Sequence, residues 1–241
     1  DLTATMVFTH WAAEMVLITN PRNLDSLAGE CVKHDVSVII GVNTLFAALL
    51  RNPVFKRAKL KRLKLTCGGG AQVQKVVAEE WLAQTQCPIL EAYGLTECSP
   101  AVCGNIPGAP WDGSVGVPIP STEVSIRGDG FRDLGFCPEG EDPAPYTGEI
   151  CVKGPQVMRG YWKKPEETAG VIRDGWLRTG DVGHMDHRGV VYITDRKKDM
   201  IIVSGFNVYP NEVENVIAAM PGVLEVGVTG VSSPKSGETV K

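Results

Sequence analysis

The chain has no long hydrophobic run and no excess of basic residues. Among its 241 residues, no apolar stretch reaches the ~18 to 20 residues that a membrane-spanning helix needs. The amino terminus opens on Asp1 and shows none of the basic-then-apolar order of a signal peptide. Lys and Arg total 24 against 28 Asp and Glu, a net charge of −4. Because binding of nucleic acid needs a concentrated basic face, we expect no nucleic-acid partner.

Paired cysteines at metal-binding or redox spacing are also missing. The seven cysteines are odd in number, scattered, and contain no Cys-x-x-Cys pair. His184 and His187 lie close in sequence, but no thiol or carboxylate set completes a zinc site at a recognisable spacing. Isolated cysteines are typical of a reducing compartment, so we expect a cytoplasmic protein without structural zinc.

The first part of the chain alternates short β-branched runs with segments of helical period. Repeated βα units of this length predict a parallel sheet with right-handed crossovers. Ligands of such sheets gather where the strands end, and two glycine-containing loops, residues 68–70 and 93–97, fall at such ends. The expected strands are 15–18, 36–41, 63–67 and 89–92, and the expected helices are 24–32, 44–50 and a segment from Val73 to Leu82.

Composition changes twice further along. Nine of the sixteen prolines lie between residues 104 and 165, and with many glycines and short strand candidates this predicts a small barrel-like β unit. A third pattern follows the charged run 195–199 and predicts the start of an α+β unit. The predicted strands are 123–126, 149–152, 190–194, 200–203 and 223–228, with a helix opening near Pro210. The predicted domains are 1–104, 105–195 and 200–241, with a hinge at 196–199.

Two of the loops carry residues suited to holding a flat, charged ligand. Gly68, Gly69 and Gly70 let the backbone approach a ligand closely, but taken alone the triplet favours a tight turn between strand and helix. Its spacing matches neither the dinucleotide fingerprint nor the P-loop. Tyr93 to Glu97 brings together an aromatic ring, a hydroxyl and a carboxylate. The alternative for that segment is a turn whose hydroxyl caps the next helix.

Two further segments carry charge. Gly180-Asp181 is expected in a loop, where an aspartate can accept both hydroxyls of a ribose or can simply bond its own backbone. The run Asp195-Arg196-Lys197-Lys198-Asp199 reads as a solvated linker on charge alone, yet Arg196 could reach sugar or phosphate oxygens and a neighbour could act as a pivot.

The order of these motifs resembles a known family. The supporting stretches are residues 67–71, 91–97, 148–154 with 159–161, 174–181, 195–199 and 203–212. Together they resemble the adenylate-forming superfamily of acyl-CoA synthetases, luciferases and peptide-synthetase adenylation domains, and most closely the bacterial long-chain fatty acid–CoA ligases. The resemblance covers essentially the whole chain.

The resemblance implies a two-step ligase. ATP and a fatty acid would give an acyl-adenylate and pyrophosphate, and coenzyme A would then displace AMP. Peripheral contact with the inner membrane is implied as well. The implied roles are adenine contact for Gly68, Gly69, Gly70 and Tyr93, a place near the acyl channel for Gly70 and Gly94, phosphate contact for Thr96, Mg²⁺ for Glu97, ribose for Asp181 and Arg196, the hinge for Lys198, and the coenzyme A path for Ser204, Gly205 and Phe206.

The sequence also departs from the family pattern. The Ser/Thr/Gly-rich phosphate loop and the late Gly-Lys segment of the family are not in this chain, and Ala92 stands where glycine is frequent. We therefore expect the 241 residues to be an internal fragment that lacks adenylating activity of its own. Two alternatives to fatty acid ligation stay open: a ligase for an aryl or short-chain acid, and a nucleotide-binding module without catalysis.

Overall fold

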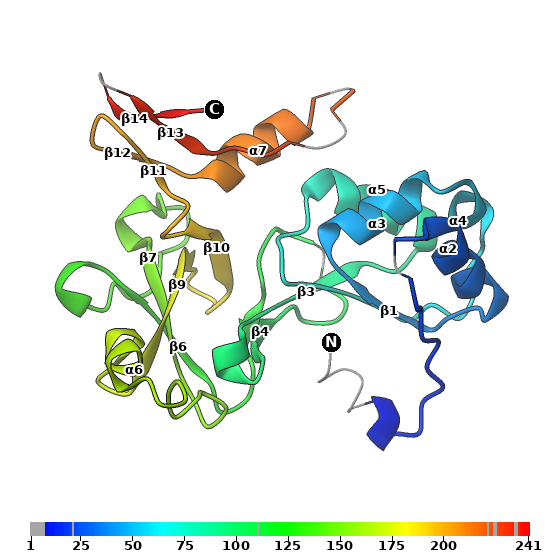
Figure 1. The fold of residues 1–241 in the computed structure, drawn as a ribbon, viewed down its shortest axis with the longest axis horizontal. Coiled ribbons are helices and arrows are strands. Elements are labelled where there is room, and N and C mark those ends of the chain that lie inside the picture. The colour runs from blue at the N-terminus through cyan, green and yellow to red at the C-terminus, as the bar shows by residue number, and fades with distance from the viewer. Residues whose placement is uncertain (1–7, 21, 110, 221, 224–225, 234–235) are drawn as a thin grey trace.

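The structure is a computed structural model that describes residues 8–20, 22–109, 111–220, 222–223, 226–233 and 236–241. The described residues form three sheets, one in each successive part of the chain. The first two sheets lie side by side, and the third lies across one end of the second (Figure 1). This order of a partly parallel α/β unit, a curled β unit and a small α+β unit confirms the fold class that the sequence predicts.

The first sheet has the strand order β1-β2-β3-β4-β5. Its first three strands are parallel, whereas β4 and β5 are added antiparallel. Helices α3 and α5 lie along the same face of the sheet (Figure 1). The strands are β1 (Val38–Gly41), β2 (Leu65–Gly69), β3 (Ile89–Gly94), β4 (Ala101–Gly104) and β5 (Val117–Pro118), and the helices are α2 (Leu24–Lys33), α3 (Asn43–Arg51), α4 (Pro53–Arg57), α5 (Lys75–Thr85) and the 3₁₀ turn η1 (Thr96–Cys98).

Aromatic side chains fill the space between these helices and the sheet. Phe46 meets Trp81 edge-on at a ring-centroid distance of 4.9 Å, and Phe55 stacks on the other side at 5.2 Å. The Trp81 indole donates to the Thr66 hydroxyl at 3.2 Å, so its polar atom is satisfied although the ring is fully buried. This core fixes β2 and β3, whose ends carry two of the predicted loops.

The strand predicted at residues 15–18 is wrong, because that segment is extended coil that pairs with no strand. Leu17 is 77% exposed, and of this segment Ile18 packs against the core. A β-branched run becomes a strand only where a sheet edge or packing surface receives it.

The second sheet is antiparallel and curled, with the order β10-β9-β7-β6 and β8 paired to β9 (Figure 1). Its longest strand, β9, includes residues 176–181, so the prediction of a loop around Gly180-Asp181 is wrong. The elements are β6 (Glu123–Arg127), β7 (Gly148–Lys153), β8 (Ile172–Arg173), β9 (Trp176–Met185), β10 (Val191–Arg196), α6 (Pro165–Val171) and the 3₁₀ turns η2 (Asp129–Phe131) and η3 (Ala144–Tyr146).

The third sheet has the order β12-β11-β14-β13. The strand predicted at 223–228 is wrong for its described residues: Val223 and residues 226–228 are in no strand, and residues 224 and 225 lie outside the described ones. The backbone of Val228 instead donates to the Glu214 carboxylate on α7 at 2.8 Å. The elements are β11 (Ile201–Val203), β12 (Phe206–Val208), α7 (Pro210–Ala218), β13 (Gly230–Ser233) and β14 (Gly237–Val240).

Three further observations concern the chain as a whole. No described helix is long and apolar enough to cross a membrane. All seven cysteines are free thiols, and burial raises the pKa of Cys103 and of Cys151 to about 12 in each case. Strand β5 lies beyond residue 104 yet belongs to the first sheet. The domain bounds given above stay a prediction.

Candidate functional site

A cleft of about 940 Å³ lies where the three sheets approach one another. Its walls come from the ends of β2 and β3, from the middle of β9, from the end of β10, and from the charged segment that leads into the third sheet. The lining residues that the sequence singles out are Gly70, Tyr93, Gly94, Glu97, Asp181, Arg196 and Lys198. Segments more than a hundred residues apart in sequence therefore meet at one cavity.

Tyr93, Asp181 and Arg196 form a connected row of polar groups in this cleft. The Tyr93 hydroxyl donates to Oδ2 of Asp181 at 2.6 Å, and the Arg196 guanidinium lies 3.4 Å from Oδ1 of the same carboxylate. Asp181 on β9 and Arg196 on β10 are direct register partners, while Tyr93 comes from the first sheet. Burial, followed by the charge of Asp181, raises the pKa of Tyr93, so the phenol remains a donor and fixes the orientation of the carboxylate.

The glycine triplet divides into two parts. Gly68 and Gly69 lie within β2, and a Cβ on Gly68 would stand 2.8 Å from Cγ2 of Val73, so glycine there permits close packing. Of the triplet, Gly70 is the one that lines the cleft, with a φ of +81°. Gly68 and Gly69 therefore serve strand packing in this structure, and adenine contact by the three glycines stays a prediction.

The end of β3 places Gly94 and Glu97 in the cleft. A Cβ on Gly94 would collide with the Pro100 carbonyl oxygen, so this position requires glycine. Glu97 Oε1 accepts a hydrogen bond from the Tyr161 hydroxyl at 2.8 Å, which leaves Oε2 available to a ligand. Thr96 begins the 3₁₀ turn and is exposed, but it is not among the residues that line the cleft.

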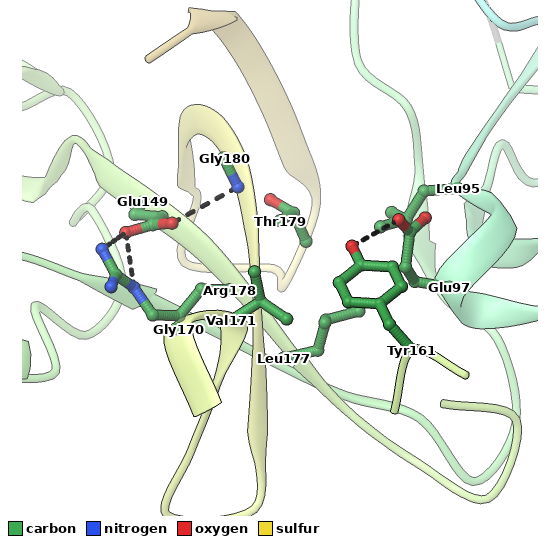
Figure 2. A pocket seen from close by; sticks show the side chains of 10 residues that line it. All are labelled: Leu95, Glu97, Glu149, Tyr161, Gly170, Val171, Leu177, Arg178, Thr179 and Gly180. Atoms are coloured by element: carbon green, nitrogen blue, oxygen red, sulfur yellow. Dashed lines mark hydrogen bonds and ion pairs between the residues drawn. The ribbon is translucent and has the colours of Figure 1, made fainter. Parts of the chain in front are cut away.

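A side pocket of about 240 Å³ opens next to Glu97, and the two cavities share Leu95, Glu97, Thr179 and Gly180. Figure 2 shows Glu97 and Glu149 on opposite sides of this pocket. Oε2 of Glu149 accepts from Nε and Nη2 of Arg178 at 3.1 and 2.8 Å. Its other oxygen accepts from the Gly180 amide at 3.3 Å. Glu149 therefore fixes the backbone immediately before Asp181.

The roles of Glu149, Tyr161 and Arg178 are not predicted by the sequence. Glu149 lies 29 residues from Arg178, and Tyr161 lies 64 residues from Glu97. The antiparallel register of β7 and β9 is what brings Glu149 and Arg178 together. No local spacing in the sequence signals such a pair.

The charged segment after β10 connects the second and third sheets. Lys198 lines the cleft and is exposed. The Lys197 amide donates to the Gly180 carbonyl at 2.8 Å, and its ammonium lies 3.6 Å from Glu149. At the start of α7, the backbone N–H of Asn211 donates to the Asp195 carboxylate at 3.1 Å. The segment is thus attached at both ends to the walls of the cleft.

The turn Ser204-Gly205-Phe206 lies away from the cleft. It joins β11 to β12, and Phe206 is 75% exposed. The structure therefore does not bring these three residues to Asp181. The roles assigned to individual site residues stay predictions.

Comparison with known proteins shows that the chain is similar to AMP-binding enzymes. Residues 2–162 match the family described as AMP-binding enzyme. A long-chain-fatty-acid–CoA ligase of Escherichia coli O6:H1 is 48% identical over 98% of this chain and 41% of that protein. A feruloyl-CoA synthase of an Amycolatopsis species is 40% identical over 86% of this chain and 40% of its own length.

Among solved structures, ATP-bound MatB from Rhodopseudomonas palustris superposes with a TM-score of 0.86 at 34% identity, covering 98% of this chain and 45% of MatB. The 241 residues thus span about two fifths of the length of the curated relatives that they match.

Proposed function

The chain belongs to the AMP-binding enzyme family, and from that premise we propose that it carries the nucleotide site of an AMP-forming long-chain fatty acid–CoA ligase. The full-length protein would join ATP and a fatty acid to an acyl-adenylate with release of pyrophosphate. The thiol of coenzyme A would then attack the acyl carbon and release AMP. The relatives named as long-chain-fatty-acid–CoA ligases support the substrate class.

The contact of Tyr93 and Arg196 with one carboxylate, Asp181, carries this proposal. A carboxylate that is fixed on both sides still has lone pairs that can accept the two hydroxyls of a ribose, and the neighbouring guanidinium can reach ribose or phosphate oxygens. Gly70, which also lines the cleft, has no side chain to obstruct a flat base. These donors and acceptors are the groups that recognition of AMP would need.

Glu97 is suited to Mg²⁺. Its carboxylate faces the cleft with one oxygen directed by Tyr161. Within the described part of the chain, no group of three or more His, Cys, Asp or Glu gathers to hold a metal. Mg²⁺ commonly uses one or two carboxylates together with phosphate oxygens and water. We propose that Glu97 holds such an ion, which when bound would stabilise charge on the transferring phosphoryl group.

The second half-reaction needs a different arrangement of the same parts. Lys198 would be the pivot of the small unit, and its rotation would bring Ser204, Gly205 and Phe206 to the path of coenzyme A. Their exposed position in this structure leaves them free to reach a new partner after such a rotation. Separating two reactions by a domain movement is a general device where each needs its own surroundings.

A ligase for an aromatic acid is the second candidate. The feruloyl-CoA synthase relative favours it, at 40% identity over 86% of this chain. The nucleotide site would be the same in both cases, so the discriminating measurement is the acid used by the full-length protein. Palmitate and ferulate would be compared at equal concentration.

The experiment is pyrophosphate release by the full-length protein with ATP, Mg²⁺ and each acid. We expect release with palmitate, little with ferulate, and a loss of at least about a hundredfold in Asp181→Ala, because charged hydrogen bonds to the substrate are removed. Glu80→Ala, an exposed substitution on α5, is the matched control. Unchanged adenylate formation in Asp181→Ala would refute the site, and preference for ferulate would refute the fatty acid.

We further propose that the protein acts in the cytoplasm and touches the anionic inner membrane surface. Six exposed basic residues within nine positions support this, and among the described residues no carboxylate oxygen lies within 4.0 Å of their charged nitrogens. Basic clusters attract anionic lipid by about 1 kcal/mol per charge. The six residues are Lys56, Arg57, Lys59, Lys61, Arg62 and Lys64.

Vesicle sedimentation tests this contact. Binding to vesicles with 30% anionic lipid, absent with neutral lipid, should weaken strongly in a Lys59→Glu, Lys61→Glu double variant. An Arg132→Glu, Lys163→Glu variant makes the same change in net charge at other exposed positions and should bind as the wild type does. Equal loss in both double variants would contradict the proposal.

A further inference from the structure

Glu91 is a buried carboxylate that the proposed reaction does not use. It lies on β3 two residues before Tyr93, on the same face of the strand, and only 3% of it is exposed. Among the described residues, no Lys, Arg or His nitrogen lies within 4.0 Å of it. Its strand neighbours Ile89 and Tyr93 belong to two different hydrophobic cores. Glu91 therefore occupies the boundary between the α/β core and the β-unit core.

Both oxygens of Glu91 accept hydrogen bonds from segments that are not part of β3. Oε2 accepts from the Val73 amide at 3.0 Å, and Oε1 accepts from the Trp111 indole at 2.9 Å. An ionised carboxylate is purely an acceptor, so it suits two N–H donors approaching from opposite sides. A glutamine could satisfy only one of them, because its amide nitrogen would face the other donor.

The two segments held by Glu91 are walls of the cleft. Gly70, Ala71 and Gln72 line it immediately before Val73, and Gly113 and Val115 line it just after Trp111. Asn105 provides a second connection between β3 and the 111–115 segment. Its backbone N–H donates to the Glu91 carbonyl at 3.0 Å, and its side-chain Nδ2 donates to the Ser114 carbonyl at 3.0 Å. The spacing of the two walls is thus set from one point on β3.

In the part of the chain that the structure describes, the one charged side chain that acts on the pKa of Glu91 is another carboxylate, that of Asp112. Burial raises the pKa of Glu91 to about 7, against the lowering effect of the Val73 and Trp111 hydrogen bonds, and the Asp112 carboxylate raises it further. Protonation would turn one oxygen from acceptor into donor and weaken its bond to an N–H group.

We propose that Glu91 is a positioning residue, whose carboxylate joins the 70–73 and 111–115 segments across the cleft and so sets the width of the nucleotide site beside Tyr93. That the site binds AMP rests on the proposed function. That Glu91 joins the two segments rests only on the geometry described above. Glu91 itself touches no substrate.

The first measurement needs no ligand. Amide hydrogen exchange of the full-length protein at pH 8 should be at least about tenfold faster in Glu91→Gln for peptides covering 70–74 and 111–116, as expected when a buried charged hydrogen bond is lost. The exposed Glu80→Gln substitution should leave both peptides unchanged. Trp111→Phe, which removes one donor and keeps the carboxylate, should affect the 111–116 peptide most. Unchanged exchange in Glu91→Gln would overturn the proposal.

The second measurement uses AMP binding by calorimetry and the fluorescence of Trp111. We expect AMP affinity to fall about tenfold in Glu91→Gln with no fall in Glu80→Gln. In the wild type, the part of the emission lost in Trp111→Phe should titrate near pH 7, and Glu91→Gln should abolish that titration. AMP affinity equal to the wild type in Glu91→Gln would overturn the positioning role. Failure of the wild type to bind AMP would instead refute the proposed function, because the exchange pattern does not depend on it.

Discussion

At the residue scale, the charge of Glu91 and the stability of the fold oppose each other. The pKa of Glu91 is raised from 4.5 to about 7 by burial, so the folded state binds this proton more tightly than the unfolded state does. The resulting stabilisation is fully present below about pH 4.5 and is lost as pH rises through 7. Each pH unit between the two pKa values corresponds to about 1.4 kcal/mol, so about 3 kcal/mol depends on this one group.

Glu91→Gln should remove that dependence. We expect the stability of the variant relative to the wild type to rise by about 2.5 kcal/mol between pH 5 and pH 8, because glutamine carries no buried charge at either pH. Thermal unfolding of both proteins, followed by circular dichroism across this range, measures the difference. Glu80→Gln, which changes an exposed residue, should differ from the wild type by a constant amount. A constant difference for Glu91→Gln as well would contradict the raised pKa.

Tyr93 and Asp181 should act as a coupled pair in ligand binding. Tyr93→Phe keeps the ring in the cleft but removes the hydroxyl that orients Asp181 at 2.6 Å. We expect AMP affinity to fall about fivefold in Tyr93→Phe and much more in Asp181→Ala, with the double variant no weaker than Asp181→Ala alone. Calorimetric titrations of the three variants measure the coupling. Strictly additive losses would show that the hydroxyl does not act through the carboxylate.

The sequence predicts the residues of this site better than it predicts their contacts. Tyr93, Asp181 and Arg196 are recognisable because each lies in a short stretch of unusual composition. The bond of Tyr161 to Glu97 and the ion pair of Glu149 with Arg178 depend on strand register and on how loops pack. Neither leaves a periodic signal, since the partners are chosen by tertiary structure.

At the element scale, strand β2 explains why glycine is needed at position 68. Gly68→Ala would place a Cβ 2.8 Å from Val73 and 3.0 Å from Ile89, and overpacking of this kind costs about 1 to 3 kcal/mol. Gly104→Ala in β4 is the matched control, because a Cβ there has no neighbour within 4 Å. Urea unfolding should show the loss for Gly68→Ala and almost none for Gly104→Ala. Equal stability of the two variants would contradict this account of the triplet.

The elements that the sequence predicts correctly are those with a clear period and a core to pack on. Helices α2 and α3 and strands β3, β6 and β7 lie close to their predicted ranges. The sequence predicts a loop in β9 because the buried and half-buried positions of this strand do not alternate. Gly180 within it also has a φ of +76°. One part of β9 packs on the β-unit core while another faces the cleft. Because the residues that face the cleft are polar or glycine, β9 lacks the alternation of apolar and polar residues that predicts a strand.

At the scale of the whole molecule, the fold class follows from the sequence while the meeting of its parts does not. Changes in composition near residues 104 and 195 separate three kinds of sheet. The first and second sheets share one hydrophobic core, to which Tyr93 and Val102 belong together with Leu177 of β9, and the Tyr93 hydroxyl adds a bond to Asp181. Between the second sheet and α7, the Asn211 backbone amide donates to Asp195. Sequence patterns report which surface of an element is buried, and they do not report which distant element covers it.

The attachment of the segment 196–198 to the second sheet should control its accessibility. Arg196, Lys197 and Lys198 are exposed, and Lys197 is held by the Gly180 carbonyl and by Glu149. Glu149→Gln removes the ion pairs with Lys197 and Arg178. The hydrogen bond from the Lys197 backbone N–H to the Gly180 carbonyl remains. We expect trypsin to cut after these residues several times faster than in the wild type, because local opening becomes easier.

A control variant and the addition of AMP test whether the Glu149 carboxylate is responsible. Glu123→Gln removes the exposed ion pair between β6 and Lys153 on β7 of the same sheet and should leave cleavage at 196–198 unchanged, since exposed pairs contribute little. Saturating AMP should slow cleavage in the wild type, because Arg196 would then be engaged by the ligand, and should slow it less in Glu149→Gln. Cleavage that is equally fast in all three proteins would show that the backbone bond to Gly180, rather than the Glu149 carboxylate, holds the segment against the cleft.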